Sequence, residues 1–198
     1  MIYSYQGDKK LPPLLVKAIQ PNYKTGPWIA GGCARCLWQD EPINDVDIWI
    51  ANNNQLLELS QRFNEVLSTT VSFSTDNALT FDYFGNDQNW KLQIIVRNRF
   101  KSLEEVFANF DFTACQIATN GEGKFYMTEQ VVEDLHTRRL RTTKFNKDGF
   151  LERWAKYTIY GFDMPKEELK EYFRPEFLNR LDQAVIFNSL NLDSMKKI

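Results

Sequence analysis

The segment WIAGGCARCLWQDEPINDVDIWI (residues 28–50) places two glycines after one short apolar run and two aspartates at the start of another. Gly31 and Gly32 are typical of a turn, and the residues after them are expected to form a short helix. Asp45 and Asp47 lie two residues apart. Because strand side chains alternate between faces, this spacing predicts that both carboxylates point to one side of a sheet. The segment therefore predicts a strand, a turn, a short helix and a second strand that brings the aspartates beside the glycines.

The two aspartates allow two interpretations. Carboxylates this close repel each other unless a cation or a basic group lies between them. Carboxylate oxygens suit Mg²⁺ or Mn²⁺, and two such ions a few ångströms apart assist displacement at phosphorus. The alternative is a solvated turn with an incidental second aspartate, and the D-x-D pattern alone favours this alternative.

The glycine pair is similarly ambiguous. It is either an ordinary turn or a stretch of backbone that approaches phosphates closely, with free amides at the start of the following helix. Arg35 would lie in the first turn of that helix. It either holds a phosphate oxygen or is a surface arginine.

The composition narrows the class of protein. The 198 residues suit one domain, or one domain with a small appendage, and the 14% aromatic content argues against a disordered chain. No apolar run approaches the roughly 20 residues of a membrane helix, and the N-terminal residues lack the pattern of a secretion signal. The formal net charge of −2 argues against binding nucleic acid through bulk charge, although a local basic patch is compatible with it.

The three cysteines indicate a reducing, cytoplasmic setting, since an odd number does not make a disulfide framework. Cys33 and Cys36 form a C-x-x-C that is compatible with a redox pair or half a zinc site. Only Cys115 and His136 remain as further soft ligands, and neither has finger-like spacing. Small buried residues at the start of a helix are the favoured interpretation.

The order of the expected elements predicts an α+β fold: a small mixed or antiparallel sheet with helices, and then a helical appendage. Strands are expected at residues 28–30, 46–51, 69–74, 78–81, 91–97, 112–119 and 125–127. Helices are expected at residues 14–19, 33–39, 55–67, 102–110 and 131–139, a turn at 82–89, and only helices from residue 150 onward. We expect domains at 1–145 and 146–198.

The pattern GG-x-x-R followed by D-V-D-I resembles the signature of the nucleotidyltransferase superfamily, which has the DNA polymerase β-like fold. It looks most similar to the head of the class II tRNA nucleotidyltransferases (CCA-adding enzymes) and bacterial poly(A) polymerases. Three later segments resemble that family in the same order. They are FDFTACQIA (110–118), VVEDLHTRRLRTTK (131–144) and FLERWAKYTIYGF (150–162), the last of which resembles the first neck helix.

The resemblance implies a nucleotidyltransferase head at residues 1–145 and a neck-like appendage at 146–198. It implies metal-dependent transfer of a nucleoside monophosphate from a nucleoside triphosphate to a hydroxyl acceptor, with release of pyrophosphate. Asp45 and Asp47 would be the catalytic residues and the ligands of Mg²⁺ or Mn²⁺. The implied nucleotide-binding residues are Gly31, Gly32, Arg35, Asp111 and Arg153. The implied acceptor is the 3′ end of an RNA, either tRNA or tRNA-like.

Departures from the family pattern keep two further hypotheses open. Cys36 stands where an aspartate usually follows the arginine, Phe110 replaces the arginine before Asp111, and the strand at 91–97 has Gln93 where many members carry an acid. One alternative is a small transferase that modifies a protein or a small molecule. The other is a degenerate member of the fold that binds a nucleotide or a partner without catalysis.

Overall fold

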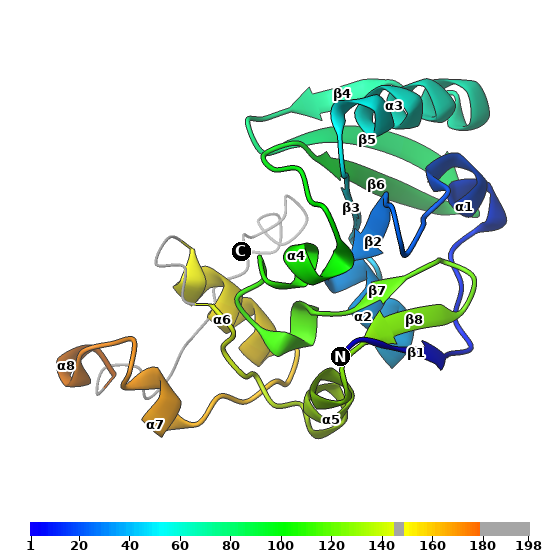
Figure 1. Cartoon of the computed structure of the whole chain (residues 1–198). Coiled ribbons are helices and arrows are strands. Elements are labelled where there is room, and N and C mark those ends of the chain that lie inside the picture. Colours follow the sequence, from blue (N-terminus) through cyan, green and yellow to red (C-terminus); the bar gives the residue numbers. More distant parts are fainter. Residues whose placement is uncertain (145–148, 179–198) are drawn as a thin grey trace, which may run out of the picture. The chain divides into compact units, whose positions relative to one another are not determined.

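The computed structural model describes residues 1–144 and 149–178 (Figure 1). The chain divides into two compact units, Met1–Lys144 and Phe145–Ile198. The assignment of residues 1–145 as a transferase head and 146–198 as a neck-like appendage stays a prediction, since contacts define a compact unit and do not define its function. Within the described ranges, none of the helices has both the length and the hydropathy that crossing a membrane requires.

The first unit is built on an eight-stranded sheet in the order β1-β8-β7-β2-β3-β6-β5-β4. Only the β3–β6 pair is parallel within this sheet, and the other neighbours are antiparallel, so the predicted α+β class with a mixed sheet is confirmed. The strands are β1 (Tyr3–Gln6), β2 (Trp28–Ala30), β3 (Asp45–Trp49), β4 (Val71–Ser74), β5 (Ala78–Gly85), β6 (Gln88–Ile95), β7 (Ala118–Thr119) and β8 (Lys124–Met127). The helices are α1 (Pro13–Ile19), α2 (Gly32–Gln39), α3 (Asn53–Leu67), α4 (Leu103–Phe107), the 3₁₀ helix η1 (Thr113–Cys115) and α5 (Glu129–Thr137).

The two faces of the sheet carry different helices. On one face, Phe63 of α3 meets Phe81 of β5 edge to face at 5.0 Å, and Arg62 of α3 donates hydrogen bonds to the last carbonyls of α1. On the other face, α4 packs on a cluster that includes Trp28 and Trp49. Val46 and Ile48 of β3 are buried, while the alternate positions Asp45 and Asp47 are half-buried. The alternation of β3 therefore turns its aspartates to the α4 side.

Helix α4 shows how local sequence sets an element boundary. Ser102 is the N-cap, and its side chain accepts a hydrogen bond from the Glu105 amide. The Glu105 carboxylate in turn accepts from the amide of Lys101 at 2.7 Å, one residue before the cap. Ser102 and Glu105 thus form a capping motif whose reciprocal bond reaches back one residue further than in the standard capping box.

Three expectations differ from the structure. The predicted strand at 112–119 is wrong for most of its length: only Ala118–Thr119 form a strand, and Thr113–Cys115 form η1, where the Thr113 hydroxyl donates to Asp134 of α5. The predicted turn at 82–89 is too long, because β5 and β6 join through the two residues Asn86 and Asp87, both at positive φ. Such two-residue turns suit the twist of a hairpin, and Asn and Asp tolerate the left-handed region. Strand β1 was not predicted at all, and it is an edge strand that pairs only with β8 among the described residues.

The second unit, as far as it is described, contains α6 (Phe150–Ile159), α7 (Lys166–Leu169) and α8 (Pro175–Leu178). Aromatic side chains pack against one another in it. Phe150 lies 5.4 Å from the ring of Tyr172 and 5.9 Å from that of Phe173, and Tyr157 meets Phe162 edge to face at 5.5 Å. The part of the predicted appendage at 145–148 and 179–198 lies outside the described residues.

Candidate nucleotide and metal site

The backbone between β2 and α2 requires glycine at residue 31. Gly31 is the N-cap of α2 and has φ 90° and ψ −136°, a conformation that L side chains rarely adopt. Its amide donates to the carbonyl of Ile117 at 2.9 Å, and its carbonyl accepts from the amide of Arg35 at 3.0 Å. A Cβ at this position would lie 3.2 Å from the ring of Phe110. Gly31 therefore has a structural explanation that needs no ligand.

Gly32 differs from its neighbour. It is the first residue of α2, its φ lies outside the left-handed region, and a Cβ added to it would meet nothing within 4 Å. The first amides of a helix lack acceptors within the helix and carry its positive dipole end. Protein packing alone does not explain glycine here, whereas an anionic ligand resting on the backbone would.

The structure brings the aspartates to this helix start. Burial raises the pKa of the Cys33 thiol well above its ordinary value, and the charges of Asp47 and Asp45 add to this shift, as does the neighbouring Cys36. Strand β2 pairs with β3 with Ile29 opposite Ile48, and the glycine turn follows β2 directly. The turn therefore begins beside the start of β3, where Asp45 and Asp47 lie, while the catalytic and binding roles of these residues stay predictions.

Three charged residues in register, one of them Asp45, form a row across three neighbouring strands. The sequence alone did not reveal this row. Asp45 of β3 is in register with Lys91 of β6, and Lys91 is in register with Asp82 of β5. Paired residues share a face, and adjacent strands lie about 4.8 Å apart. Strand β6 carries no acid, as predicted, but the next strand supplies Asp82. Recognising the two-residue turn and the alternation of FDYFG would have placed Asp82 on a strand.

Arg35, predicted to hold a phosphate, is only 2% exposed. Its guanidinium makes an ion pair with Glu41 and donates to the side-chain oxygen of Gln39 at 3.0 Å. Glu41 also accepts from Arg138 at 2.6 Å. Burial works to raise the pKa of Glu41, but the hydrogen bonds and charges of the two arginines outweigh it and hold this pKa below its ordinary value. Arg35 thus anchors the segment after α2, and its contact with phosphate stays a prediction.

Hydrogen bonds join the two later motifs, at residues 110–118 and 131–144, to each other. Asp134 of α5 is fully buried, and its carboxylate accepts from the Thr113 hydroxyl at 2.6 Å and from Arg141 at 3.1 and 3.2 Å. Asp111 is 7% exposed, and its carbonyl accepts from the amide of Thr143 at 2.7 Å. Arg153 lies on α6 in the second unit. The nucleotide-binding roles of Asp111 and Arg153 stay predictions.

The cysteines do not make a zinc site in the described part of the chain. All three are free and buried. The described ranges contain no group of three or more His, Cys, Asp or Glu side chains that could hold a metal ion. That Asp45 and Asp47 hold a metal ion stays a prediction, and two carboxylates would suit Mg²⁺ when substrate phosphates complete its coordination.

Comparison with solved structures defines the class of protein through its fold. The apo form II of a CCA-adding enzyme matches with a TM-score of 0.59 and 16% identity, over 86% of this chain and 47% of that one. A CCA-adding enzyme in complex with CTP matches with a TM-score of 0.55 and 15% identity, over 95% of this chain and 50% of that one. At these identities the likeness shows the fold alone: the protein has the nucleotidyltransferase fold of CCA-adding enzymes.

Residues 8–138 match the model of the Gabija anti-defense 2 family protein, and the chain belongs to this family. Gabija anti-defense 2 of Bacillus phage SPbetaL7 is 28% identical over 173 residues, which are 84% of this chain and 39% of that protein. A stretch of 32 residues, 16% of this chain, is 59% identical to an ATP-dependent Clp protease ATP-binding subunit ClpA homolog of Porphyra purpurea, of which it covers 4%. The chain thus spans well under half the length of these curated relatives.

Proposed function

We propose that this protein is a metal-dependent nucleotidyltransferase that transfers a nucleoside monophosphate from a nucleoside triphosphate to a hydroxyl acceptor and releases pyrophosphate. The observation that carries the proposal is the D-x-D of β3 next to the open first turn of α2. The likeness in fold to a CCA-adding enzyme in complex with CTP supports it. Family membership adds a biological setting, since the name of the relative describes action against a defence called Gabija.

In this proposal Asp45 and Asp47 hold Mg²⁺ or Mn²⁺ together with the phosphate oxygens of the substrate. The bound ion would supply positive charge that offsets the charge of the transferring phosphoryl group. The two aspartates lie at alternate positions of one strand, so both carboxylates point to the same side of the sheet. Without a cation, two such carboxylates would repel each other.

The remaining groups position the triphosphate. The backbone at Gly32 receives phosphate oxygens on the first amides of α2. Lys91, in register with Asp45, adds a positive charge beside this carboxylate. Asp111 and Arg153 complete the proposed nucleotide contacts. Catalysis then rests on orientation and on charge placed before the reaction begins.

For the acceptor we favour the 3′ end of an RNA, because the ordered motifs are most similar to the branch that acts on such ends. A protein of the opposed defence is a second candidate, and the family name favours it. Both acceptors use the same site and the same donor, so a single labelling experiment separates them.

The experiment incubates the protein with each α-labelled nucleoside triphosphate, Mg²⁺ or Mn²⁺, total RNA and a lysate that contains the Gabija system. Label should enter RNA, and Asp45→Asn and Asp47→Asn should each lower the rate by at least about 100-fold. Asp76→Asn, an exposed aspartate in the turn between β4 and β5, is the matched control and should transfer normally. Label in protein would select the second acceptor. An absence of label with every metal and nucleotide would refute the catalytic proposal.

A further inference from the structure

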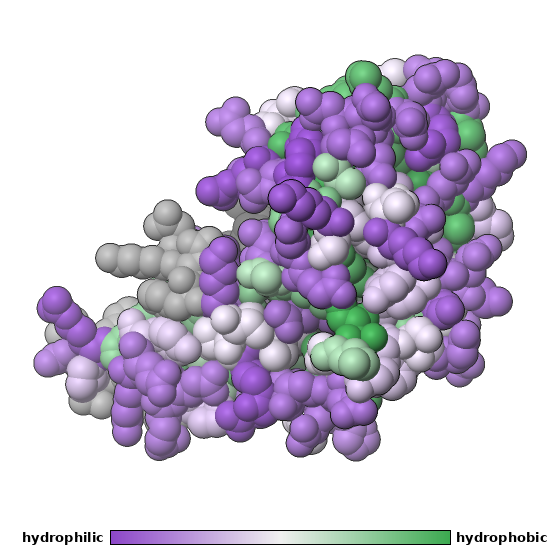
Figure 2. Space-filling model, in the orientation of Figure 1, coloured by the Kyte–Doolittle hydropathy of each residue, from purple (hydrophilic) through white to green (hydrophobic). Residues whose placement is uncertain are grey.

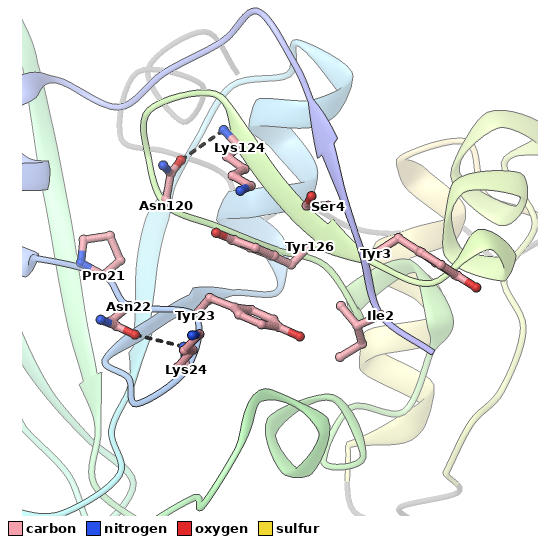
Figure 3. A pocket seen from close by; sticks show the side chains of 10 residues that line it. All are labelled: Ile2, Tyr3, Ser4, Pro21, Asn22, Tyr23, Lys24, Asn120, Lys124 and Tyr126. Atoms are coloured by element: carbon pink, nitrogen blue, oxygen red, sulfur yellow. Dashed lines mark hydrogen bonds between the residues drawn. The ribbon is translucent and has the colours of Figure 1, made fainter.

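A second pocket lies apart from the D-x-D, between the loop that follows α1 and the strands β1 and β8 (Figure 3). Its volume is about 560 Å³, within the usual range for ligand sites. Tyr23, Tyr126, Lys24 and Lys124 line it, and none of the described residues in its lining is acidic. In a chain with a net charge of −2, this is a local concentration of positive charge around aromatic rings.

The two tyrosines form a stacked pair, one ring above the other in Figure 3. Their centroids are 4.4 Å apart and their planes differ by 14°. Tyr126 packs against the core cluster under α4, whereas Tyr23 is 36% exposed. The carbonyl of Tyr23 accepts a hydrogen bond from the indole of the buried Trp28 at 2.9 Å. The exposed ring is therefore held in place before any ligand binds.

Two asparagines fix the backbone of the lysines. The side-chain oxygen of Asn22 accepts from the Lys24 amide at 2.9 Å, and that of Asn120 accepts from the Lys124 amide at 3.0 Å (Figure 3). Their side-chain NH₂ groups remain as donors at the pocket wall. The Lys124 ammonium lies 5.8 Å from the centroid of the Tyr126 ring. Each tyrosine of the pair thus has a lysine beside it.

We propose that this pocket binds a segment of single-stranded nucleic acid. One base stacks on the exposed face of Tyr23, and the flanking phosphates pair with Lys24 and Lys124. Stacking on an aromatic platform with cations along the backbone is the general way in which proteins hold single strands. The asparagine NH₂ groups meet acceptor atoms on the base edge. Figure 2 shows mainly hydrophilic side chains on the visible face, with hydrophobic ones in small areas.

The pocket faces the same side of the sheet as the D-x-D. Tyr126 of β8 is in register with Ala118 of β7, Ala118 with Ala30 of β2, and Trp28 of β2 with Trp49 of β3. Asp47 precedes Trp49 by two residues and shares its face. Three strand spacings, about 14 Å, separate Tyr126 from the row of Trp49. A nucleotide upstream of a reacting 3′ end would occupy the pocket. This role for the pocket in holding the acceptor rests on the proposed function.

Fluorescence anisotropy of a labelled oligo(U), in EDTA and without nucleoside triphosphate, tests binding separately from catalysis. Tyr23→Ala should weaken binding by about tenfold, and Tyr23→Phe should keep it within about twofold, since the ring is retained. Lys24→Gln and Lys124→Gln should each lower the slope of log affinity against log salt by about 0.7. The matched controls, Lys17→Gln on α1 and Phe84→Ala on β5, should bind as the wild type does.

Unchanged binding by Tyr23→Ala and by the double lysine variant, or no binding by the wild-type chain, would overturn the proposal. Binding must also persist in the Asp45→Asn variant, because that carboxylate lies outside the pocket. Oligo(U) bound at the pocket by a protein that never transfers label would leave this site standing and remove the proposed function. If Tyr23→Ala changes neither the transfer of label to RNA nor the binding of oligo(U), the proposed function stands and the pocket site is removed.

Discussion

Replacing Gly31 and Gly32 in turn by alanine separates folding from ligand binding at adjacent positions. At Gly31 the backbone has φ 90° and ψ −136°, and a new methyl group would lie 3.2 Å from the Phe110 ring. A side chain in such a region costs about 1–3 kcal/mol. With the close ring contact added, we expect Gly31→Ala to lower the free energy of unfolding by about 2–3 kcal/mol. For a domain of this size the melting temperature then falls by about 5–10 °C.

Gly32→Ala should behave in the opposite way. The position is helical, the space around its Cβ is open, and alanine is the better helix former by up to about 1 kcal/mol. Stability should therefore stay equal or rise slightly. The methyl group would, however, occupy the side from which a triphosphate approaches the amides of α2. The loss of one charge-assisted hydrogen bond corresponds to about a tenfold or greater loss of affinity.

Urea denaturation followed by circular dichroism measures the free energy of unfolding of both variants. Equilibrium dialysis of labelled nucleoside triphosphate with Mg²⁺ measures their affinity for the nucleotide. Gly32→Ala that binds the triphosphate as tightly as the wild type would refute the assignment of the α2 start as the phosphate site. Gly31→Ala that unfolds at the wild-type urea concentration would show that the strain argument is wrong.

Three further predictions concern groups that are buried or partly buried. Glu41→Gln should lower stability by about 2 kcal/mol at neutral pH. The pKa of Glu41 lies below its ordinary value of 4.5. The loss of stability should therefore be constant above pH 4.5 and should shrink as the pH falls through the lowered pKa. Urea titrations at several pH values measure it, with Glu122→Gln as an exposed control. Asp134→Ala should lower stability by about 1–3 kcal/mol in thermal melts, since the buried Thr113 hydroxyl and the partly exposed Arg141 both lose their bonds to this carboxylate. The Cys33 thiol should react with a thiol reagent near pH 8 only after unfolding, and rapid labelling of the native protein would contradict its burial and raised pKa.

Elements with a strong local pattern could be predicted from the sequence. The strand–turn–helix–strand unit at residues 28–50 and the amphipathic helix α3 lie where periodicity places them, within a few residues at each end. Strand β1 could not be found this way, because its residues alternate weakly and its only described partner, β8, lies more than a hundred residues further along the chain. The segment at 112–119 was misread for a related reason. A bond to the distant Asp134 fixes its first half.

The candidate site likewise has parts that the sequence predicts and parts that it does not. The glycine pair and the D-x-D are local patterns, and the structure places them together. The row of Lys91 and Asp82 depends on strand register, which follows from a turn of two residues that composition does not reveal. Arg35 shares its partner Glu41 with Arg138, which lies 97 residues after Glu41 in the sequence. A sequence motif identifies a residue, but the role of that residue depends on its partners elsewhere in the chain.

The ion pair of Arg35 with Glu41 also suggests that Arg35 positions helix α2. Helix α2 is held at its start by the bond from Gly31 to the Ile117 carbonyl and near its end by the pair of Arg35 with Glu41. Gln39, its last residue, also donates to the carbonyl of Leu135 on α5 at 3.0 Å. Phosphate contacts require groups placed to within about 0.5 Å, and a helix fixed at both ends meets this need. Breaking the Glu41 contact is therefore expected to loosen the far end of α2 and to weaken triphosphate binding at Gly32, even though Glu41 itself lies beyond the other end of the helix.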